Sequence, residues 1–220
     1  AEGYTNSNPA TGGPIMQEYL TIANVDPGNA SAAVTIILKS KTGATQSFPV
    51  TLGAQSQLAW NVNANNTFSG SSPEVSAEVK SSGANIVVQR QLYFSYSHTT
   101  SDSQTLHAQG GTDVVGQVAS GAYTSYSFAE GYSKTGYNEW LTVQNPTASS
   151  ETISITMVNG YGRNKTLSFP VAANSRFTLD ISSAVLQNLV QAGDDHRGYE
   201  VSMTVQTLNN GGAFLAGRPM

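Results

Sequence analysis

The stretch Glu18-Tyr19-Leu20-Thr21-Ile22 decides the fold, and it returns 121 residues later as Glu139-Trp140-Leu141-Thr142-Val143. In both versions apolar side chains alternate with polar ones, a period of two that places one face of a β-strand against a core. The same alternation runs through residues 33–38, 57–62 and 86–94. A repeated strand among further strands of this pattern predicts an all-β chain that contains two copies of one unit.

Further landmarks recur in the same order, at offsets between 121 and 128 residues. They are Ala1-Glu2-Gly3-Tyr4 with Ala129-Glu130-Gly131-Tyr132, Ser47-Phe48-Pro49-Val50 with Ser168-Phe169-Pro170-Val171, Glu74-Val75-Ser76 with Glu200-Val201-Ser202, and Arg90 with Arg218. Insertions and deletions fall between the landmarks, as expected of two repeats with separate cores and variable loops. We expect a first repeat at 1–94, a Ser-, Thr- and Gly-rich connecting segment at 95–122, and a second repeat at 123–220.

Each repeat has room for six or seven short strands separated by turn residues such as Asp26-Pro27-Gly28-Asn29. This organisation favours two tandem immunoglobulin-like antiparallel β-sandwich repeats, with a small barrel as the alternative. Strands are expected near 18–24, 33–39, 57–62, 75–80 and 86–94, with equivalents in the second copy. The residues expected in two separate cores are Phe48, Trp60 and Val79, and Phe169, Leu179 and Val205.

One helix is expected, with Ser182-Ser183 as its cap, residues 184–190 as its body and Gly193 as its stop. The equivalent residues 63–67 have no helical pattern, so the helix is interpreted as a loop decoration. Residues 123–128 read as an aromatic strand that leads into the second Ala-Glu-Gly. By symmetry, a similar strand is expected before residue 1.

The composition excludes several classes of partner. Only 11% of the residues are charged and the net charge is -4, against about 25% charged residues in an average chain. Without clusters of Lys and Arg, the chain is not expected to bind nucleic acid or anionic membranes. No apolar run approaches the roughly 20 residues that span a bilayer, so membrane insertion is not expected.

The compartment is inferred from the same composition. The chain has no cysteine and is rich in Ser, Thr and Asn, which is typical of a secreted bacterial surface protein, and units of this size do not need disulfides. The chain opens inside its own repeat motif, so we expect a segment of a longer polypeptide. The expected location is extracellular or at the cell surface.

Several ordered motifs resemble a family of bacterial extracellular tandem β-repeats. The motifs are Ser127-Phe128-Ala129-Glu130-Gly131, Glu139-Trp140-Leu141-Thr142-Val143-Gln144-Asn145-Pro146, Pro170-Val171-Ala172-Ala173-Asn174-Ser175-Arg176, Gln89-Arg90-Gln91-Leu92-Tyr93-Phe94, Gly217-Arg218-Pro219-Met220 and Gly110-Gly111-Thr112-Asp113-Val114-Val115-Gly116. They cover nearly the whole chain. The resemblance implies tandem β-domains of large secreted or cell-surface proteins and no known activity. Thr112 replaces a family histidine, and Gln89 and Gly217 replace a family glutamate, which weakens any metal or acid–base role there.

The recurring charged residues are Glu2 with Arg90 and Glu130 with Arg218. An acid beside an electrophilic partner is one interpretation. We favour a structural clamp between the first and last strands of each unit, because a strand clamp needs repetition and a catalytic pair does not. The expected contact is a bidentate ion pair of Glu130 with Arg218.

The remaining candidates for metal or ligand binding lie in predicted loops. His98, Asp102, His107 and Asp113 share one segment, but Gly- and Ser-rich surroundings give metal ligands no rigid support. Asp194-Asp195-His196 is expected to be a helix-to-strand loop, and Asp26-Pro27-Gly28-Asn29 a turn and not a calcium site. We therefore expect no metal and no cofactor.

Neither an activated nucleophile nor a known catalytic motif stands out, so we expect no enzyme and no catalytic residues. The aromatic side chains in or beside loops are Tyr4, Tyr132, Tyr137 and Tyr161. Exposed aromatic platforms bind sugars, so a carbohydrate-binding module is the alternative function, with its binding residues unknown. The favoured function is a non-catalytic structural or adhesion repeat, a stalk or spacer. Its expected partners are neighbouring repeats of the same polypeptide, with a glycan or another surface component left open.

Overall fold

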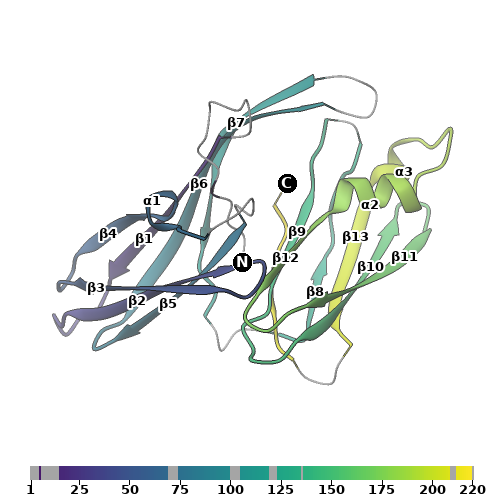
Figure 1. Ribbon diagram of the computed structural model, residues 1–220. Helices are drawn as coiled ribbons and strands as arrows, with labels where there is room; N and C mark the ends of the chain where they lie inside the picture. The colour runs from purple at the N-terminus through teal and green to yellow at the C-terminus, as the bar shows by residue number, and fades with distance from the viewer. Residues whose placement is uncertain are drawn as a thin grey trace. The chain divides into compact units, whose positions relative to one another are not determined.

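The computed structural model describes residue 5 and residues 15–68, 74–99, 105–118, 123–134, 136–208 and 212–219. The chain divides into two compact units, with the boundary after Val118. Each unit consists of antiparallel strands in two sheets (Figure 1). None of the helices in these ranges has the length and apolar character needed to cross a membrane.

The first unit contains one four-stranded and one three-stranded sheet. Its elements are β1 (Ile15–Asn24), β2 (Ala32–Ser40), β3 (Thr45–Leu52), β4 (Gln57–Asn61), α1 (Val62–Asn65), β5 (Val75–Ser82), β6 (Ile86–Thr99) and β7 (Thr105–Val115). One sheet has the order β4-β1-β6-β7 and the other β3-β2-β5. Strand β1 pairs on both sides and buries Leu20 and Ile22 at 2% and 0% exposure, as its alternation predicts.

The second unit has the same number of strands in a related arrangement. Its elements are β8 (Ser125–Phe128), β9 (Trp140–Gln144), β10 (Glu151–Asn159), β11 (Asn164–Val171), β12 (Arg176–Asp180), α2 (Ile181–Asn188), α3 (His196–Tyr199), β13 (Val201–Thr207) and β14 (Leu215–Gly217). Here the orders are β12-β9-β14 and β11-β10-β13-β8.

The two units share the topology of six strands and differ in the seventh, which is β7 beside β6 in the first unit and β8 beside β13 in the second. The sheet β4-β1-β6 corresponds to β12-β9-β14, and β3-β2-β5 corresponds to β11-β10-β13. The register agrees as well, because Tyr19 faces Asn61 and the equivalent Trp140 faces Asp180. The predicted fold of two antiparallel, immunoglobulin-like β-sandwich repeats is confirmed, and two separate sheets per unit exclude the barrel.

Each unit encloses its own hydrophobic core, as predicted. In the first, Trp60 is 8% exposed and packs against Phe48 with ring centroids 5.1 Å apart, and Val79 lies at the border of the core. In the second, Val205 is fully buried, and Phe169 and Leu179 pack against the core.

The predicted connecting segment at 95–122 is wrong over most of its length. Strand β6 continues to Thr99, and β7 pairs with it from Thr105 to Val115, so these residues belong to the first sandwich. Two glycines that read as loop residues lie opposite aromatic rings: a Cβ on Gly110 would come within 3.2 Å of Phe94, and one on Gly111 within 3.2 Å of Tyr93. Glycine therefore leaves the rings room to lie on the sheet.

The interpretation of the helix also needs correction. Helix α2 begins at Ile181 with Asp180 as its N-cap, and the side chain of Asp180 accepts a hydrogen bond from the Ser183 amide. Ile181 and Val185 are fully buried in the core, so α2 is part of the fold and not a decoration. A shorter helical turn, α1, occupies the same place after β4. Its N-cap Asn61 accepts a hydrogen bond from Ala64 in the same way.

Candidate functional site

The recurring arginine of the second unit pairs with a different acid from the one predicted. Arg218 lies beside β9, and its Nε atom is 3.2 Å from Oε1 of Glu139, with the two side chains 6% and 1% exposed. Glu130 follows the end of β8 and is exposed to solvent. The predicted pairing of Arg218 with Glu130 is therefore wrong, and Glu2 lies outside the described residues.

The first unit has the same acid and base in the same register. Arg90 faces Leu20, and Glu18 lies two residues before that leucine on β1. Continuing the pairing of β14 with β9 places Arg218 opposite Leu141, again two residues after the acid. Glu18 and Arg90 are 1% and 9% exposed. The duplicated element is thus a buried carboxylate diagonal to a buried guanidinium, one in each sandwich.

The surroundings of Glu139 favour a structural role of its carboxylate over a catalytic one. Burial raises the pKa of its carboxyl to about 6, although the neighbouring Arg218 guanidinium opposes the shift. The backbone of Gly131 is so near that a Cβ there would lie 2.5 Å from Oε2 of Glu139, which explains the glycine of the Ala-Glu-Gly-Tyr motif. A carboxylate enclosed in this way is not accessible to a substrate.

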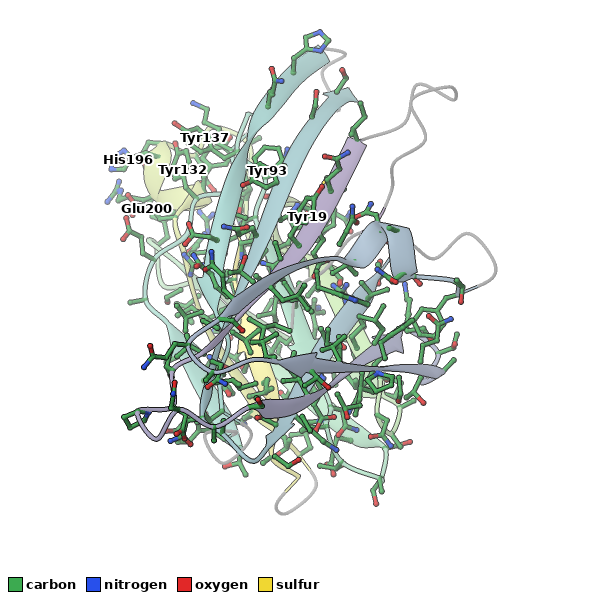
Figure 2. All side chains as sticks on the ribbon, turned by 90° about the vertical axis from the view of Figure 1, so that its left-hand side faces the viewer. Tyr19, Tyr93, Tyr132, Tyr137, His196 and Glu200 are labelled. Carbon is green, nitrogen blue, oxygen red and sulfur yellow. The ribbon has the colours of Figure 1, made fainter. Side chains whose placement is uncertain are left out.

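An open surface with exposed aromatic rings lies elsewhere, on the outer face of the β4-β1-β6-β7 sheet. A hollow there is lined by Gln17, Tyr19, Gln91 and Tyr93. Tyr19 and Tyr93 make an edge-to-face contact at 6.3 Å, and Tyr93 is 51% exposed. Figure 2 shows both rings on this face of the sheet. We call these four residues the aromatic–amide face.

Strand pairing gives the aromatic–amide face its polar border. Along one row, Asn61, Tyr19, Gln91 and Asp113 come from four adjacent strands. The amide of Asn61 donates to the Tyr19 hydroxyl at 3.4 Å, and the Asp113 carboxylate accepts from Gln89. Aromatic rings among amides provide both stacking surfaces and hydrogen-bonding groups.

The second unit repeats one aromatic of this face. Trp140 is equivalent to Tyr19, is 40% exposed, and faces the helix-capping Asp180 where Tyr19 faces the helix-capping Asn61. The sequence interpretation missed Tyr93 and Trp140 as exposed residues and Tyr19 as a partly exposed one. The signal was present, because Tyr19 falls in the outward phase of a strand whose inward phase is Leu20 and Ile22.

Two of the predicted loop tyrosines gather in the second unit (Figure 2). Tyr132 contacts Tyr137 edge to face at 5.0 Å and lies 6.3 Å from the ring of Tyr199. The ammonium group of Lys134 sits 5.6 Å from the Tyr199 ring. Tyr137 is 59% exposed, so this cluster presents one free ring to solvent. Tyr4 lies outside the described residues.

Tyr161 is held by charged neighbours instead of forming an open platform. The guanidinium groups of Arg163 and Arg197 each lie over its ring, at 4.7 and 4.5 Å from the centroid, and its hydroxyl donates to Asp195. Arg163 makes two hydrogen bonds to Asp194, and this pairing holds the pKa of that carboxyl below its usual range. The predicted helix-to-strand loop is wrong at this point, because Asp195 caps α3.

The predicted histidine segment forms a hairpin and not a loop. His107 lies on β7, where its Nδ1 is 2.7 Å from Ser97 Oγ, and Asp113 is six residues farther along the strand, a separation of about 20 Å. The side chain of His98 and all of Asp102 lie outside the described residues. His196 faces Glu200 at 3.9 Å and is well exposed. Within the described ranges, no three His, Cys, Asp or Glu residues are grouped for a metal.

The predicted turn at Asp26 is confirmed. The carboxylate of Asp26 accepts a hydrogen bond from the Gly28 amide at 2.8 Å, and Asn29 has a φ of 61°. Both features are typical of an Asx turn, since asparagine tolerates the left-handed conformation.

Comparison with known proteins finds a similarity of structure but no match by sequence. No protein-family model matches it, and no curated protein matches its sequence. Among solved structures it is similar to the Anabaena sensory rhodopsin transducer, with 14% identity and a TM-score of 0.34, over 44% of this chain and 96% of that chain. A TM-score of this size supports no argument about function.

Proposed function

We propose that this chain is a pair of non-catalytic structural repeats, a stalk or adhesion spacer of a larger secreted or cell-surface bacterial protein. One observation carries the proposal: the polar residues that recur as Glu18 and Glu139, Asn24 and Asn145, and Arg90 and Arg218 lie in the interior of each sandwich. Duplicated structural residues with different exposed surfaces are what a repeated spacer requires. Neighbouring repeats are the proposed partners.

The recurring asparagines illustrate this use. Asn24 is 3% exposed, and its side-chain amide donates to the carbonyl groups of Ala30 and Gly53. The equivalent Asn145 is fully buried and donates to Ser149 and to the backbone of β11. Each amide joins two loops at the end of its sandwich, a buried polar network that fixes backbone geometry.

The acid of each unit is tied to the following helix in the same manner. The Glu18 amide donates to the side chain of Asn63 at 2.8 Å, and the Glu139 amide donates to Ser182 at 2.9 Å. These contacts join β1 to α1 and β9 to α2. They make each sandwich a self-contained unit, as a spacer under tension needs.

Single-molecule stretching of the whole chain tests the spacer function. We expect two cooperative unfolding steps, each lengthening the chain by about 35–40 nm, because each unit has roughly 100–120 residues of about 0.36 nm. One combined step, or gradual extension at low force, would contradict two separately folded mechanical units.

Carbohydrate binding is the second candidate, and the aromatic–amide face favours it. Sugars stack on aromatic rings and bond to amides, and this face combines Tyr19 and Tyr93 with two glutamines on a nearly uncharged surface. A glycan array probed with the whole chain and with Tyr19→Ser/Tyr93→Ser tests it. Tyr137→Ser, which removes an exposed ring from the other unit, is the matched control.

The array separates the two candidates. Binding that is lost in the double variant and retained in Tyr137→Ser supports a carbohydrate-binding module. Equal signals for all three proteins exclude the aromatic–amide face as a glycan site and leave the spacer function in place.

A further inference from the structure

One ring of the aromatic–amide face rests against the backbone of a glycine. Tyr93 on β6 faces Gly111 on β7, and a Cβ on that glycine would lie 3.2 Å from Cδ1 and 3.5 Å from Cε1 of the Tyr93 ring. The ring therefore extends over β7, into space that a side chain at position 111 would fill. Because Tyr93 is 51% exposed, this ring is an aromatic platform that is open to solvent.

The second ring stands at a steep angle to that platform. The planes of Tyr19 and Tyr93 make an angle of 76°, with centroids 6.3 Å apart, and both rings are labelled in Figure 2. The hydroxyl of Tyr19 accepts a hydrogen bond from the Asn61 amide at 3.4 Å. Two rings at this angle cannot both stack on one flat surface, so Tyr19 is a side wall of the platform and not a second platform.

Two amide side chains flank the rings. Gln17 on β1 lies opposite Tyr93, and Gln91 on β6 lies opposite Tyr19, so rings and amides alternate around a square of four residues. The amide oxygen of Gln91 accepts a hydrogen bond from the Thr21 hydroxyl at 3.3 Å. Its NH₂ group remains a donor for a ligand, and the amide of the exposed Gln17 can both donate and accept.

The charge beside the platform is negative. The row that contains Tyr19 and Gln91 continues to Asp113 on β7, an exposed carboxylate that accepts a hydrogen bond from Gln89. Its backbone is about 5 Å from that of Gln91, the spacing of neighbouring strands, which is within the Debye length of about 8–10 Å. Among the outward residues of β1, β6 and β7 beside the hollow, none is Lys or Arg. An acidic ligand would therefore meet repulsion without a compensating cation.

A neutral pyranose fits this combination of groups. Its C–H face carries a weak positive potential and stacks on the negative face of an aromatic ring. The hydroxyl groups around its rim exchange hydrogen bonds with amides, which both donate and accept. Tyr19 closes the β1 side of the platform, whereas Gly111 has no side chain, so the rest of a glycan extends across β7.

We propose that the aromatic–amide face binds a single uncharged pyranose residue of a glycan. Tyr93 is the platform, Tyr19 is the side wall, and the amides of Gln17 and Gln91 are the hydrogen-bonding groups. Gly111 is a positioning residue, because it acts through the Tyr93 ring. The inference rests on the carbohydrate-binding candidate and narrows its ligands to neutral sugars, excluding acidic glycans and the flat faces of crystalline polysaccharides.

Solution NMR of the whole chain with free methyl glycosides tests the proposal. The neutral probes are methyl glucoside and methyl galactoside. The acidic probes are the corresponding glucuronide and galacturonide, which differ from them only by a carboxylate at C6. Chemical-shift changes of the Tyr93 ring and of the Gln17 and Gln91 NH₂ groups report binding at this face. Cosedimentation with microcrystalline cellulose measures binding to a flat polysaccharide surface.

A pair of glycine variants tests the platform. Gly111→Ala should shift the Tyr93 ring signals of the free chain and weaken binding of the neutral glycosides about tenfold or more, because its Cβ displaces the ring. Gly110→Ala is the matched control, because its Cβ would meet Phe94 on the opposite face of the sheet, and it should bind like the original chain. Thermal unfolding shows that each variant remains folded at the temperature of the titration.

Binding of the neutral glycosides at this face, at least about tenfold weaker for the acidic ones, would support the proposal. Equal or tighter binding of the acidic glycosides, or unchanged binding in Gly111→Ala, would overturn it and leave carbohydrate binding in place. Cosedimentation with cellulose in the absence of binding to free glycosides would also overturn it. No shift with any glycoside, together with an empty glycan array, would remove the carbohydrate-binding candidate as well.

Discussion

In the first unit, the sheet that contains β1 has four strands, because β7 lies beside β6. In the second unit, the opposite sheet, which contains β10, has four strands, because β8 lies beside β13. The order of the other six strands agrees between the two units. The repeated sequence therefore specifies the interior of a sandwich, while the units can differ at their sheet edges. Function in such a pair is best sought at edges and outer faces.

The buried acid and base show what the units share. Glu139 and Arg218 pair at 3.2 Å, and Glu18 and Arg90 occupy the same diagonal of the register. A buried pair of this kind is costly to break by removing one partner, because the other charge stays behind. Its repetition in both sandwiches favours a role in fixing strand register.

Removing the large ring of the first core gives the largest expected effect. Trp60→Ala should lower the free energy of unfolding of the first unit by about 3–5 kcal/mol, because the side chain is buried and its loss leaves a cavity. Denaturation followed by amide signals of each unit measures it. The second unit should unfold unchanged. A loss of stability in both units would contradict the presence of separate cores.

A variant that breaks the buried pair tests how much this shared element of the interior contributes to stability. Arg218→Met should destabilise the second unit by about 3 kcal/mol, because it strands the Glu139 carboxylate. Adding Glu139→Gln should restore part of the loss, whereas adding Glu130→Gln should not. Chemical denaturation of the original chain, of Arg218→Met and of the two double variants measures the free energies of unfolding. Recovery of stability on adding Glu130→Gln would show that Glu130 is a partner of Arg218.

The pH dependence of the second unit follows from the same carboxyl. Its folded pKa of about 6 lies above the ordinary value of 4.5, so the folded chain binds the proton more tightly than the unfolded chain. This contribution to stability is full below about pH 4.5 and decreases by about 2 kcal/mol as the pH rises through 6.

Glu139→Gln removes the titrating carboxyl. The difference between the stability of the original chain and that of the variant, measured against pH, therefore gives the contribution of this carboxyl alone. The expected difference is a slope confined to about pH 4.5–6. A difference that slopes the other way would show that Arg218 outweighs burial. Glu130→Gln, which removes an exposed carboxylate, should leave the slope in place.

The helix caps give the smallest expected effect. Asp180→Ala and Asn61→Ala each remove the side chain that accepts a hydrogen bond from the amide of the third helical residue, Ser183 in α2 and Ala64 in α1. We expect a loss of about 1 kcal/mol for Asp180 and less for Asn61, because α1 is a four-residue turn. A larger loss at Asn61 would show that α1 supports the first sandwich more than its length indicates.

The sequence alone predicts most of the strands and the duplication, because alternation and the order of the landmarks can be read directly from the residues. It misplaced the β6–β7 hairpin, since Ser, Thr and Gly are common in loops and the role of Gly110 and Gly111 depends on rings from another strand. It also missed Asp180 as a cap, because Ser182 and Ser183 offered the same chemistry two residues later.

The candidate sites were harder to predict than the fold. The choice of Glu130 over Glu139 as the arginine partner depended on which strands are neighbours, and only the sheet order decides that. The aromatic–amide face depends on Tyr19 and Tyr93 meeting across two strands 74 residues apart. A contact between residues this far apart in the sequence cannot be predicted from a local pattern.

Native-state hydrogen exchange tests the comparison most directly, by measuring the amides of β5 and β13 in one sample. We expect the amides along 202–206 to exchange only with unfolding of the second unit, because β13 is paired on both sides. Along 76–80, amides directed away from β2 should exchange at least about tenfold faster than those bonded to it. Uniform slow exchange along β5 would show that its edge is already covered, and would contradict the difference between the two units.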